Sequence, residues 1–458
     1  MRGFAAALVA IAAALAFGVV ARSAAAPAPS FAKTVWYRAS PNPSSVVIQD
    51  LNGDGKPDLA LANSWMDWQV QVGDQYEGMG SVSVRLNRGD GTFQPRRDYL
   101  AGLGSVAIAA GDLNGDGAPD LATANSGSEN DFGSVSILLG RGDGSFLPKH
   151  DYGAGDEADS VAIGDVNGDH KPDVLSIGGK SVSVFLNSGD GGLQPKVDYP
   201  LGKYASSLAL VDVDGDGHLD VVTATGNTVL VLRNAGNGTF GAPKSYDSGA
   251  ATSFAASADV NGDGKPDLVV SHSERPLVSV LLNAGDGTFA ARRDYRAGSG
   301  SEPAIAAADL NGDGHPDIVT PGYGGISLLL NAGDGTFEAP LGYRGGNEYG
   351  AVAVGDLNGD GRADIAATAS TDDDESTGAL ELSVLIDKPG VCNVQRLSRL
   401  TLTAAKEQLA RANCAVGKVT LKFSKTVKKG LVSSQTPAFG AVIPGGGKVS
   451  LVISSGKR

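Results

Sequence analysis

The sequence of 458 residues contains only two cysteines and five histidines. Two cysteines exclude a disulfide-rich scaffold and a cysteine-based zinc cluster. Glutamate is also scarce, with 10 residues against 41 aspartates. This skew disfavours a helical protein, because aspartate suits turns and ligand loops better than helix interiors. Nucleophile-elbow, Walker, dinucleotide-binding and HExxH motifs are all missing. After residue 25 no apolar run reaches 18 residues, so we expect no membrane span there.

Glycine, in contrast, is abundant at 65 residues, and a hydrophobic fraction of 41% excludes a disordered chain. The net charge of −14 is unevenly distributed. Residues 391–458 carry 12 Lys and Arg against the single Glu407, a net of +11, whereas residues 26–390 have a net of −27. An acidic body followed by a basic C-terminal domain is therefore expected, and such an asymmetry points to interaction partners.

The N-terminus has the pattern of an export signal. A basic residue at position 2, an apolar run over 4–20 and small residues at 23–25 predict a signal peptide over 1–25, cleaved after Ala25. The alternative is a retained membrane anchor. In either case we expect the rest of the protein outside the cytoplasm, secreted or associated with the cell wall, where calcium is available and cysteines can be oxidised.

An internal repeat dominates the remaining sequence. A nine-residue string, DLNGDGKPD in its first copy, recurs seven times at spacings of 47 to 62 residues, and periods of this size indicate an array of supersecondary units. We call these segments the Asp loops and number their positions 1 to 9. They start at residues 50, 112, 165, 212, 259, 309 and 356.

Short apolar segments surround each Asp loop and predict four strands per repeat. They are bounded by Gly, Asn and Asp turns and show no helical period. Seven such units arranged radially form a β-propeller. The fourth strand is marked by a Phe and a Tyr six residues apart, with Leu193 in place of Phe in the third repeat, and the last repeat lacks this pair. Because Phe31 and Tyr37 have the same spacing, we expect an all-β, seven-bladed propeller over 31–387 whose N-terminal strand completes the last blade.

The Asp loops have the chemistry of calcium sites. Oxygen-bearing side chains fall at positions 1, 3, 5 and 9, and Gly at position 6 allows a turn that directs the position-7 carbonyl inward. Six to eight oxygen ligands in a flexible loop suit calcium. We expect about seven structural Ca²⁺ ions at one rim. The predicted ligands are Asp50, Asn52, Asp54, Lys56 and Asp58; Asp112, Asn114, Asp116, Ala118 and Asp120; Asp165, Asn167, Asp169, Lys171 and Asp173; Asp212, Asp214, Asp216, His218 and Asp220; Asp259, Asn261, Asp263, Lys265 and Asp267; Asp309, Asn311, Asp313, His315 and Asp317; and Asp356, Asn358, Asp360, Arg362 and Asp364.

Two loops depart from the pattern. Asp214 adds a fourth carboxylate in the fourth loop, which should tighten calcium binding there. His170 replaces the position-6 glycine of the third loop and should adopt a strained positive φ.

These residues resemble the FG-GAP or VCBS repeat family, seven-bladed propellers like the calcium-binding head of integrin α chains. The fourth repeat contains the name-giving string at Phe240-Gly241-Ala242-Pro243. The resemblance covers roughly residues 31–387 and implies structural calcium in the Asp loops.

Residues 391–458 resemble a PASTA domain, a small α+β fold. An apolar helical face at Leu402, Ala405, Leu409 and Ala412 precedes two strand-like segments, within 430–440 and 447–456. The resemblance implies a disulfide between Cys392 and Cys414 and recognition of peptidoglycan. The basic charge also suits another anionic wall polymer or, alternatively, docking on the acidic propeller. Gln395 stands where the family commonly has proline.

Three long loops between second and third strands, at 63–80, 125–133 and 370–378, belong to blades that become neighbours once the ring closes. Functional residues favour such loops on a rigid scaffold, and exposed tryptophans often anchor ligands. The alternative is a surface insertion whose tryptophans pack on the blade. The predicted ligand face comprises Trp65, Asp67, Trp68 and Tyr76.

These patterns predict a secreted bacterial, calcium-binding propeller that acts as a non-catalytic cell-surface or cell-wall binding or adhesion module. Its partner would be an extracellular glycan or protein, without nucleic acid, and we expect a monomer. The alternative is an extracellular carbohydrate-active enzyme of lyase or dehydratase type, which would need a cluster of His, Lys, Arg or Tyr near the channel mouth.

Overall fold

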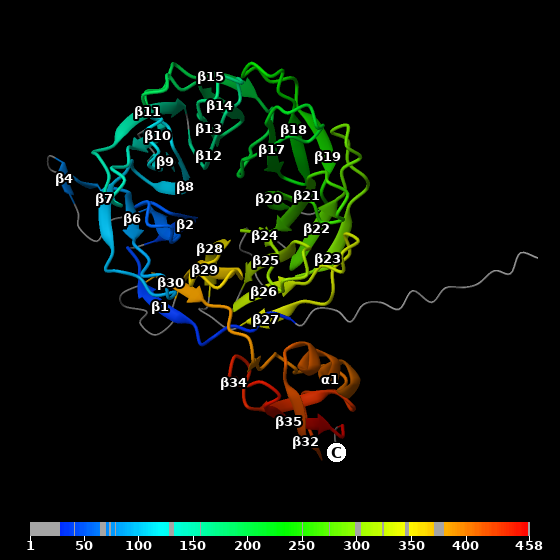
Figure 1. Cartoon of the computed structure of the whole chain (residues 1–458). Coiled ribbons are helices and arrows are strands. Elements are labelled where there is room, and N and C mark those ends of the chain that lie inside the picture. The colour runs from blue at the N-terminus through cyan, green and yellow to red at the C-terminus, as the bar shows by residue number, and fades with distance from the viewer. Residues whose placement is uncertain are drawn as a thin grey trace, which may run out of the picture.

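The protein consists of a ring of sheets and a smaller C-terminal domain beside it (Figure 1). Seven four-stranded antiparallel sheets form the ring, each a blade whose first strand lies nearest the central axis. The predicted all-β propeller is therefore confirmed. The computed structural model describes residues 28–40, 42–64, 70–72, 75–77, 79–127, 132–155, 157–249, 251–273, 275–297, 304–322, 325–343, 348–370 and 380–456.

Each blade follows the same burial gradient from axis to periphery. In blade one, β2 (Pro43–Gln49) contributes to the axis, β3 (Asp58–Asn63) and β6 (Ser81–Arg85) are wholly buried, and β7 (Arg97–Leu100) is the exposed outer strand. The small and β-branched residues of the middle strands fit because both of their faces pack against neighbouring blades. A short hairpin of β4 (Val70–Val72) and β5 (Gln75–Glu77) is inserted between β3 and β6.

The other blades repeat this order. Blade two comprises β8 (Ser105–Gly111), β9 (Asp120–Asn125), β10 (Gly133–Leu138) and β11 (His150–Gly155); blade three β12 (Ser160–Gly164), β13 (Asp173–Gly178), β14 (Ser181–Phe185) and β15 (Val197–Pro200); blade four β16 (Ala209–Val211), β17 (Asp220–Thr225), β18 (Thr228–Leu232) and β19 (Lys244–Asp247); blade five β20 (Thr252–Ala258), β21 (Asp267–His272), β22 (Leu277–Leu281) and β23 (Arg293–Arg296); blade six β24 (Ala306–Ala308), β25 (Asp317–Gly322), β26 (Gly325–Leu329) and β27 (Leu341–Tyr343); and blade seven β28 (Glu348–Gly355), β29 (Asp364–Ser370), β30 (Leu380–Leu385) and β1 (Val35–Arg38).

The N-terminal strand closes the ring, as the sequence predicts. Strand β1 pairs antiparallel with β30, with Val35 opposite Val384. Blade one is joined to blade seven by the Asn87 side chain, which donates a hydrogen bond to the Leu357 carbonyl at 2.8 Å. The outer edge of blade seven is therefore occupied by a strand from the other end of the chain, which avoids an unpaired sheet edge.

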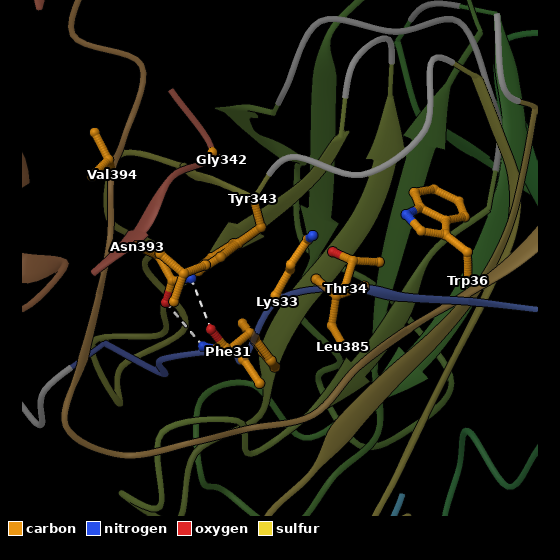
Figure 2. A pocket seen from close by; sticks show the side chains of 12 residues that line it. Phe31, Lys33, Thr34, Trp36, Gly342, Tyr343, Leu385, Asn393 and Val394 are labelled. Carbon is orange, nitrogen blue, oxygen red and sulfur yellow. Dashed lines mark hydrogen bonds between the residues drawn. The ribbon is translucent and has the colours of Figure 1, made fainter. Parts of the chain in front are cut away.

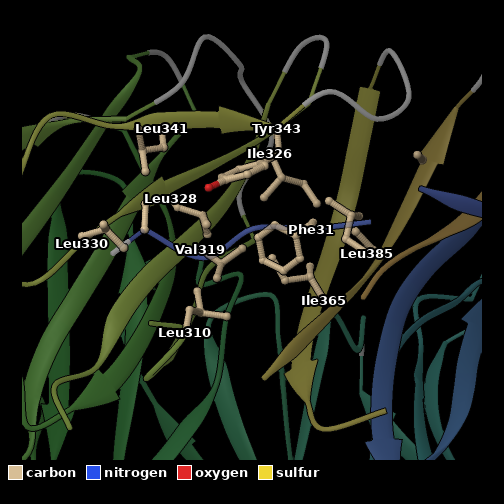
Figure 3. Packing of buried hydrophobic residues seen from close by; sticks show 13 residues of the cluster. Phe31, Leu310, Val319, Ile326, Leu328, Leu330, Leu341, Tyr343, Ile365 and Leu385 are labelled. Carbon is tan, nitrogen blue, oxygen red and sulfur yellow. The ribbon is translucent and has the colours of Figure 1, made fainter. Parts of the chain in front are cut away.

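The repeated Phe and Tyr residues join neighbouring blades. Tyr99 of blade one contacts Phe146 of blade two edge-to-face, with ring centroids 5.3 Å apart, and Tyr37 meets Phe93 in the same way. Phe31 and Tyr343 form the equivalent pair, 4.9 Å apart, inside the apolar cluster between blades six and seven (Figure 3). The six-residue spacing thus places one ring at each of two successive blade interfaces.

The C-terminal domain has its own apolar core. Its helix α1 (Leu402–Arg411) begins at the N-cap Thr401 and buries Ala405 and Leu409. A disulfide joins Cys392 to Cys414, as the resemblance implies. Its strands are β31 (Val391–Asn393), paired with β34 (Val442–Pro444), and β32 (Ala415–Lys422), β35 (Lys448–Ser454) and β33 (Val432–Thr436), which form one sheet in that order.

Candidate metal sites

All seven Asp loops adopt the same backbone turn around their first aspartate. In blade one, Asp50 accepts hydrogen bonds from the Gly53 N–H through Oδ1 and from the Gly55 N–H through Oδ2, both at 2.8 Å. The equivalent pair measures 2.7 to 2.9 Å in the other six loops. Each loop is therefore wrapped around a half-buried carboxylate whose remaining lone pairs are available to a cation.

The side chains at positions 3 and 5 accept hydrogen bonds from backbone N–H groups two residues further along the loop. In blade one the Asn52 Oδ1 accepts from the Asp54 N–H at 2.9 Å, and Asp54 accepts from the Lys56 N–H at 3.0 Å. The Lys56 ammonium lies 3.3 Å from the Asp54 carboxylate. Arg362 contacts Asp360 in the same way in blade seven, at 2.6 Å. A basic residue at position 7 therefore partly neutralises the loop.

Position 9 is a buried aspartate at the base of each loop. Asp58 is fully buried and accepts from the Leu51 N–H at 3.0 Å and from the Asn87 N–H at 2.7 Å. Burial raises the pKa of Asp58 to about 6, against the effect of these two hydrogen bonds, and Asp54 and Asp50 raise it further. Burial likewise raises the pKa of Asp317 to about 7 and that of Asp364 to about 6. A positive charge in the loop would stabilise the ionised form of these groups.

The third loop contains the strained residue that the sequence predicts. His170 has a φ of 63°, whereas the position-6 glycines of the other loops lie between 78° and 87°. Its backbone N–H still donates to Asp165, at 2.8 Å. The histidine side chain therefore does not change the turn. The loop is destabilised only because a residue with a side chain adopts the left-handed backbone conformation.

Blade four gathers the densest negative charge of these loops. Asp212, Asp214 and Asp216 each place one carboxylate oxygen within 4.8 Å of the others. The Arg233 guanidinium lies 2.7 Å from the Asp214 carboxylate. Three carboxylates at this distance repel one another unless cations lie close to them.

The donor set of the Asp loops fits calcium. The side chains are carboxylates and amides, all hard oxygen ligands, held by backbone hydrogen bonds in a turn that does not depend on a regular helix or strand. Histidine occurs at position 7 only in blades four and six, where the prediction assigns the carbonyl oxygen. Oxygen-only coordination favours Ca²⁺ over zinc or copper.

The predicted ligand face is not placed by the structure. Trp65, Asp67 and Trp68 lie outside the described residues, as do 128–131 and 371–379 of the neighbouring long loops. Tyr76 belongs to β5, whose backbone is described. Consecutive connections in an antiparallel blade lie at opposite ends, so the described strand ends that flank the blade-one segment, Asn63 of β3 and Ser81 of β6, lie at the end of the blade opposite its Asp loop.

Small side chains predominate on six of the seven axial strands, and the seventh, β28, also carries Glu348 and Tyr349. The strands β2, β8, β12, β16, β20 and β24, all within the described part of the chain, carry small, aliphatic and hydroxyl side chains, one phenylalanine and one glutamine. Serines in or just before these strands bridge neighbouring blades, since the Ser44 hydroxyl donates to the Ser105 carbonyl and the Ser206 hydroxyl to the Ser253 carbonyl, both at 2.9 Å.

Sequence reasoning did not identify the contact surface between the propeller and the C-terminal domain. Gln395 is fully buried, and its Oε1 accepts a hydrogen bond from the Gly342 N–H of blade six at 2.8 Å. Arg411 of α1 forms a second contact with the propeller, an ion pair with Glu338 at 2.5 Å. One feature of the sequence could have indicated this contact, namely that Gln395 stands where the PASTA family commonly has proline.

Two family profiles match the chain. The FG-GAP-like repeat matches six overlapping segments, 50–123, 112–176, 165–223, 212–270, 259–320 and 309–367, and the PASTA domain matches 393–455. No curated protein matches the chain. Among the described residues, no helix has the length and hydrophobicity required to cross a membrane.

Several solved structures are similar in fold. They include a lectin from Agrocybe aegerita described as recognising non-reducing terminal N-acetylglucosamine (24% identity, 68% of this chain and 80% of that chain, TM-score 0.46). Another is BBS1N, solved in complex with ARL6DN, which is 13% identical and matches over 78% of this chain and 98% of that chain, with a TM-score of 0.50. A third is the V. cholerae biofilm matrix protein Bap1, which is 14% identical and matches over 80% of this chain and 91% of that chain, with a TM-score of 0.40.

Proposed function

The chain belongs to the FG-GAP-like repeat family and carries a C-terminal PASTA domain, and on this basis we propose that it is a secreted, non-catalytic binding or adhesion protein whose propeller requires calcium. The ring supplies a rigid scaffold, and the loops on its rims are free to vary without loss of blade packing. Binding, rather than turnover, suits axial strands that carry mainly aliphatic and hydroxyl side chains.

Calcium binding is supported most strongly by the three clustered carboxylates of blade four. In each loop the side chains at positions 1, 3 and 5, the position-7 carbonyl and the position-9 aspartate would hold the ion. In blade four these are Asp212, Asp214, Asp216, the His218 carbonyl and Asp220. The bound ion would offset the negative charge that the loops gather at one rim and would hold each turn against the base of its blade.

The ligand face is proposed to lie on the opposite rim, at the long loops of blades seven, one and two. Trp65 and Trp68 would be its aromatic anchors and Asp67 and Tyr76 its polar groups. The basic C-terminal domain is proposed to bind peptidoglycan or another anionic wall polymer, so that the two parts of the chain would bridge two different partners.

This function is tested by screening the full chain on a glycan array and on isolated cell walls, with and without calcium. The variant Trp65→Ala/Trp68→Ala should lose binding to the propeller's ligand, since one aromatic anchor is worth about 2 kcal/mol or more. The matched control is Tyr204→Ala, because Tyr204 is an aromatic residue that is 68% exposed in another connection. Intact binding by the double variant would exclude this face.

A further inference from the structure

A pocket of about 200 Å³ lies where the propeller meets the C-terminal domain (Figure 2). One wall is the N-terminal segment from Phe31 to Trp36. A second comes from Gly342 and Tyr343 of blade six, and a third from the C-terminal domain, including Asn393 and Val394. Neither domain alone forms the site.

The walls of this pocket are fixed by hydrogen bonds rather than by loose contact. The Asn393 amide accepts from the Phe31 N–H and donates to the Phe31 carbonyl, both at 2.9 Å (Figure 2). The Gln395 amide holds Gly342 at 2.8 Å. A pocket whose walls are already fixed loses little conformational entropy when a ligand binds.

Polar groups from the N-terminal segment face the same space. Figure 2 shows the Lys33 ammonium, the Thr34 hydroxyl and the Trp36 indole nitrogen directed towards the pocket interior. Lys33 is exposed and forms no ion pair with any described residue. It is also the one charged side chain among the described residues that line the pocket.

The lining combines an aromatic side chain with a few polar groups, which is a combination that can bind a sugar. Trp36 is half-buried against the cluster between blades six and seven, so its ring is a rigid apolar surface with a polar edge. The Trp36 indole N–H can donate a hydrogen bond to a sugar hydroxyl. A single cation in an otherwise neutral lining selects a ligand with one anionic group.

We propose that this interdomain pocket, which we call the junction site, binds one sugar ring that bears a carboxylate, with Lys33 on the carboxylate and Trp36 against the ring. The volume is below the roughly 300–1,000 Å³ of sites for drug-sized ligands, so it suits one ring rather than an oligosaccharide. The inference rests on the proposed glycan-binding function and adds a second site to it.

The test uses ¹⁹F NMR on full-length protein labelled with 5-fluorotryptophan. The protein has three tryptophans, and Trp36→Phe assigns the resonance of the junction site. The probes are methyl β-glucuronide and its neutral counterpart, methyl β-glucoside, each titrated into calcium-containing buffer. We expect the glucuronide to shift the Trp36 resonance and the glucoside to do so only at much higher concentration.

A second variant tests the role of the charge. Because Lys33 is exposed, Lys33→Met should fold normally, and it should weaken glucuronide binding about tenfold or more by removing a charge-assisted contact. Unchanged glucuronide affinity in Lys33→Met, or a Trp36 resonance that does not move with either sugar, would overturn the junction site. Shifts confined to Trp65 and Trp68 would also overturn it, but would leave the proposed function of the propeller face intact.

Discussion

Asn393, in the first strand of the C-terminal domain, makes two hydrogen bonds of 2.9 Å with the backbone of Phe31, in the segment that closes the propeller. Phe31 is almost wholly buried, so neither backbone group has water as an alternative partner. The neighbouring Ser30 N–H donates to Asp387 at 3.0 Å. The C-terminal domain therefore helps to hold the closing segment in place.

Asn393→Ala should destabilise the ring. It leaves the buried N–H and carbonyl of Phe31 unpaired, at a cost of about 1–3 kcal/mol for each group. We expect a lower midpoint of thermal unfolding for the whole propeller, measured by near-UV circular dichroism. The matched control is Asn227→Ala, at an exposed turn of blade four, which should change the midpoint little. Equal midpoints for the two variants would mean that the domain contact does not stabilise closure.

His170→Gly should strengthen calcium binding by blade three. The histidine holds a φ of 63°, a conformation that costs on the order of 1 kcal/mol for a residue with a side chain. Glycine removes this cost in the folded loop, and we expect severalfold tighter binding in a titration followed by the amide resonance of Gly168. The reverse change in blade one, Gly55→His, should weaken its site. An unchanged titration in both variants would refute the backbone explanation.

Asp214→Asn should weaken calcium binding by blade four alone. It removes one of three carboxylates whose oxygens lie within 4.8 Å of one another, and it introduces the Asn that all six other loops have at position 3. Calcium affinity rises with ligand charge. Site-resolved NMR titration should show a loss in this loop and no change in blades three and five. If the affinity rises instead, the Arg233 contact at 2.7 Å governs the site.

Without calcium, the protein should become less stable as pH rises towards neutrality. The pKa of Asp317 is about 7 in the folded protein because of burial, well above its ordinary value of 3.8. For an acid whose folded pKa is raised, the stabilising contribution is present below the unfolded pKa and is lost as pH rises from about 4 to 7. In chelator, Asp317→Asn should flatten the pH dependence of the unfolding midpoint over this window. An identical slope in the variant would contradict the assignment.

The repeats are the part of the structure that the sequence predicts well. Each blade is specified locally by short apolar strands, by glycines at turns that need positive φ, and by aspartates at fixed spacing. The closing strand was also predictable, because Phe31 and Tyr37 repeat the spacing of every fourth strand. The spacing does not indicate which rings touch. Phe31 contacts Tyr343 of the preceding blade and not Tyr37, the residue with which it forms the sequence pair.

The domain contact could not be predicted in the same way. Asn393, Gln395 and Gly342 lie far apart in the sequence and belong to no repeat, so their hydrogen bonds depend on the assembled ring. The position-9 aspartates were predicted as ligands. Each also accepts hydrogen bonds from at least two backbone N–H groups. One of these N–H groups follows the third strand of the blade, so this contact depends on the folded blade and could not be predicted from the loop sequence.

The most direct test of a calcium-dependent propeller is to measure bound calcium and thermal stability on the same full-length sample. We expect about seven Ca²⁺ ions per chain by atomic emission after dialysis into calcium-containing buffer. We also expect a large fall in the unfolding midpoint on chelation, because an ion at 1,000 times its Kd stabilises the folded state by about 4 kcal/mol per site. A chain that retains no calcium and whose midpoint is unmoved by chelator would contradict the calcium dependence.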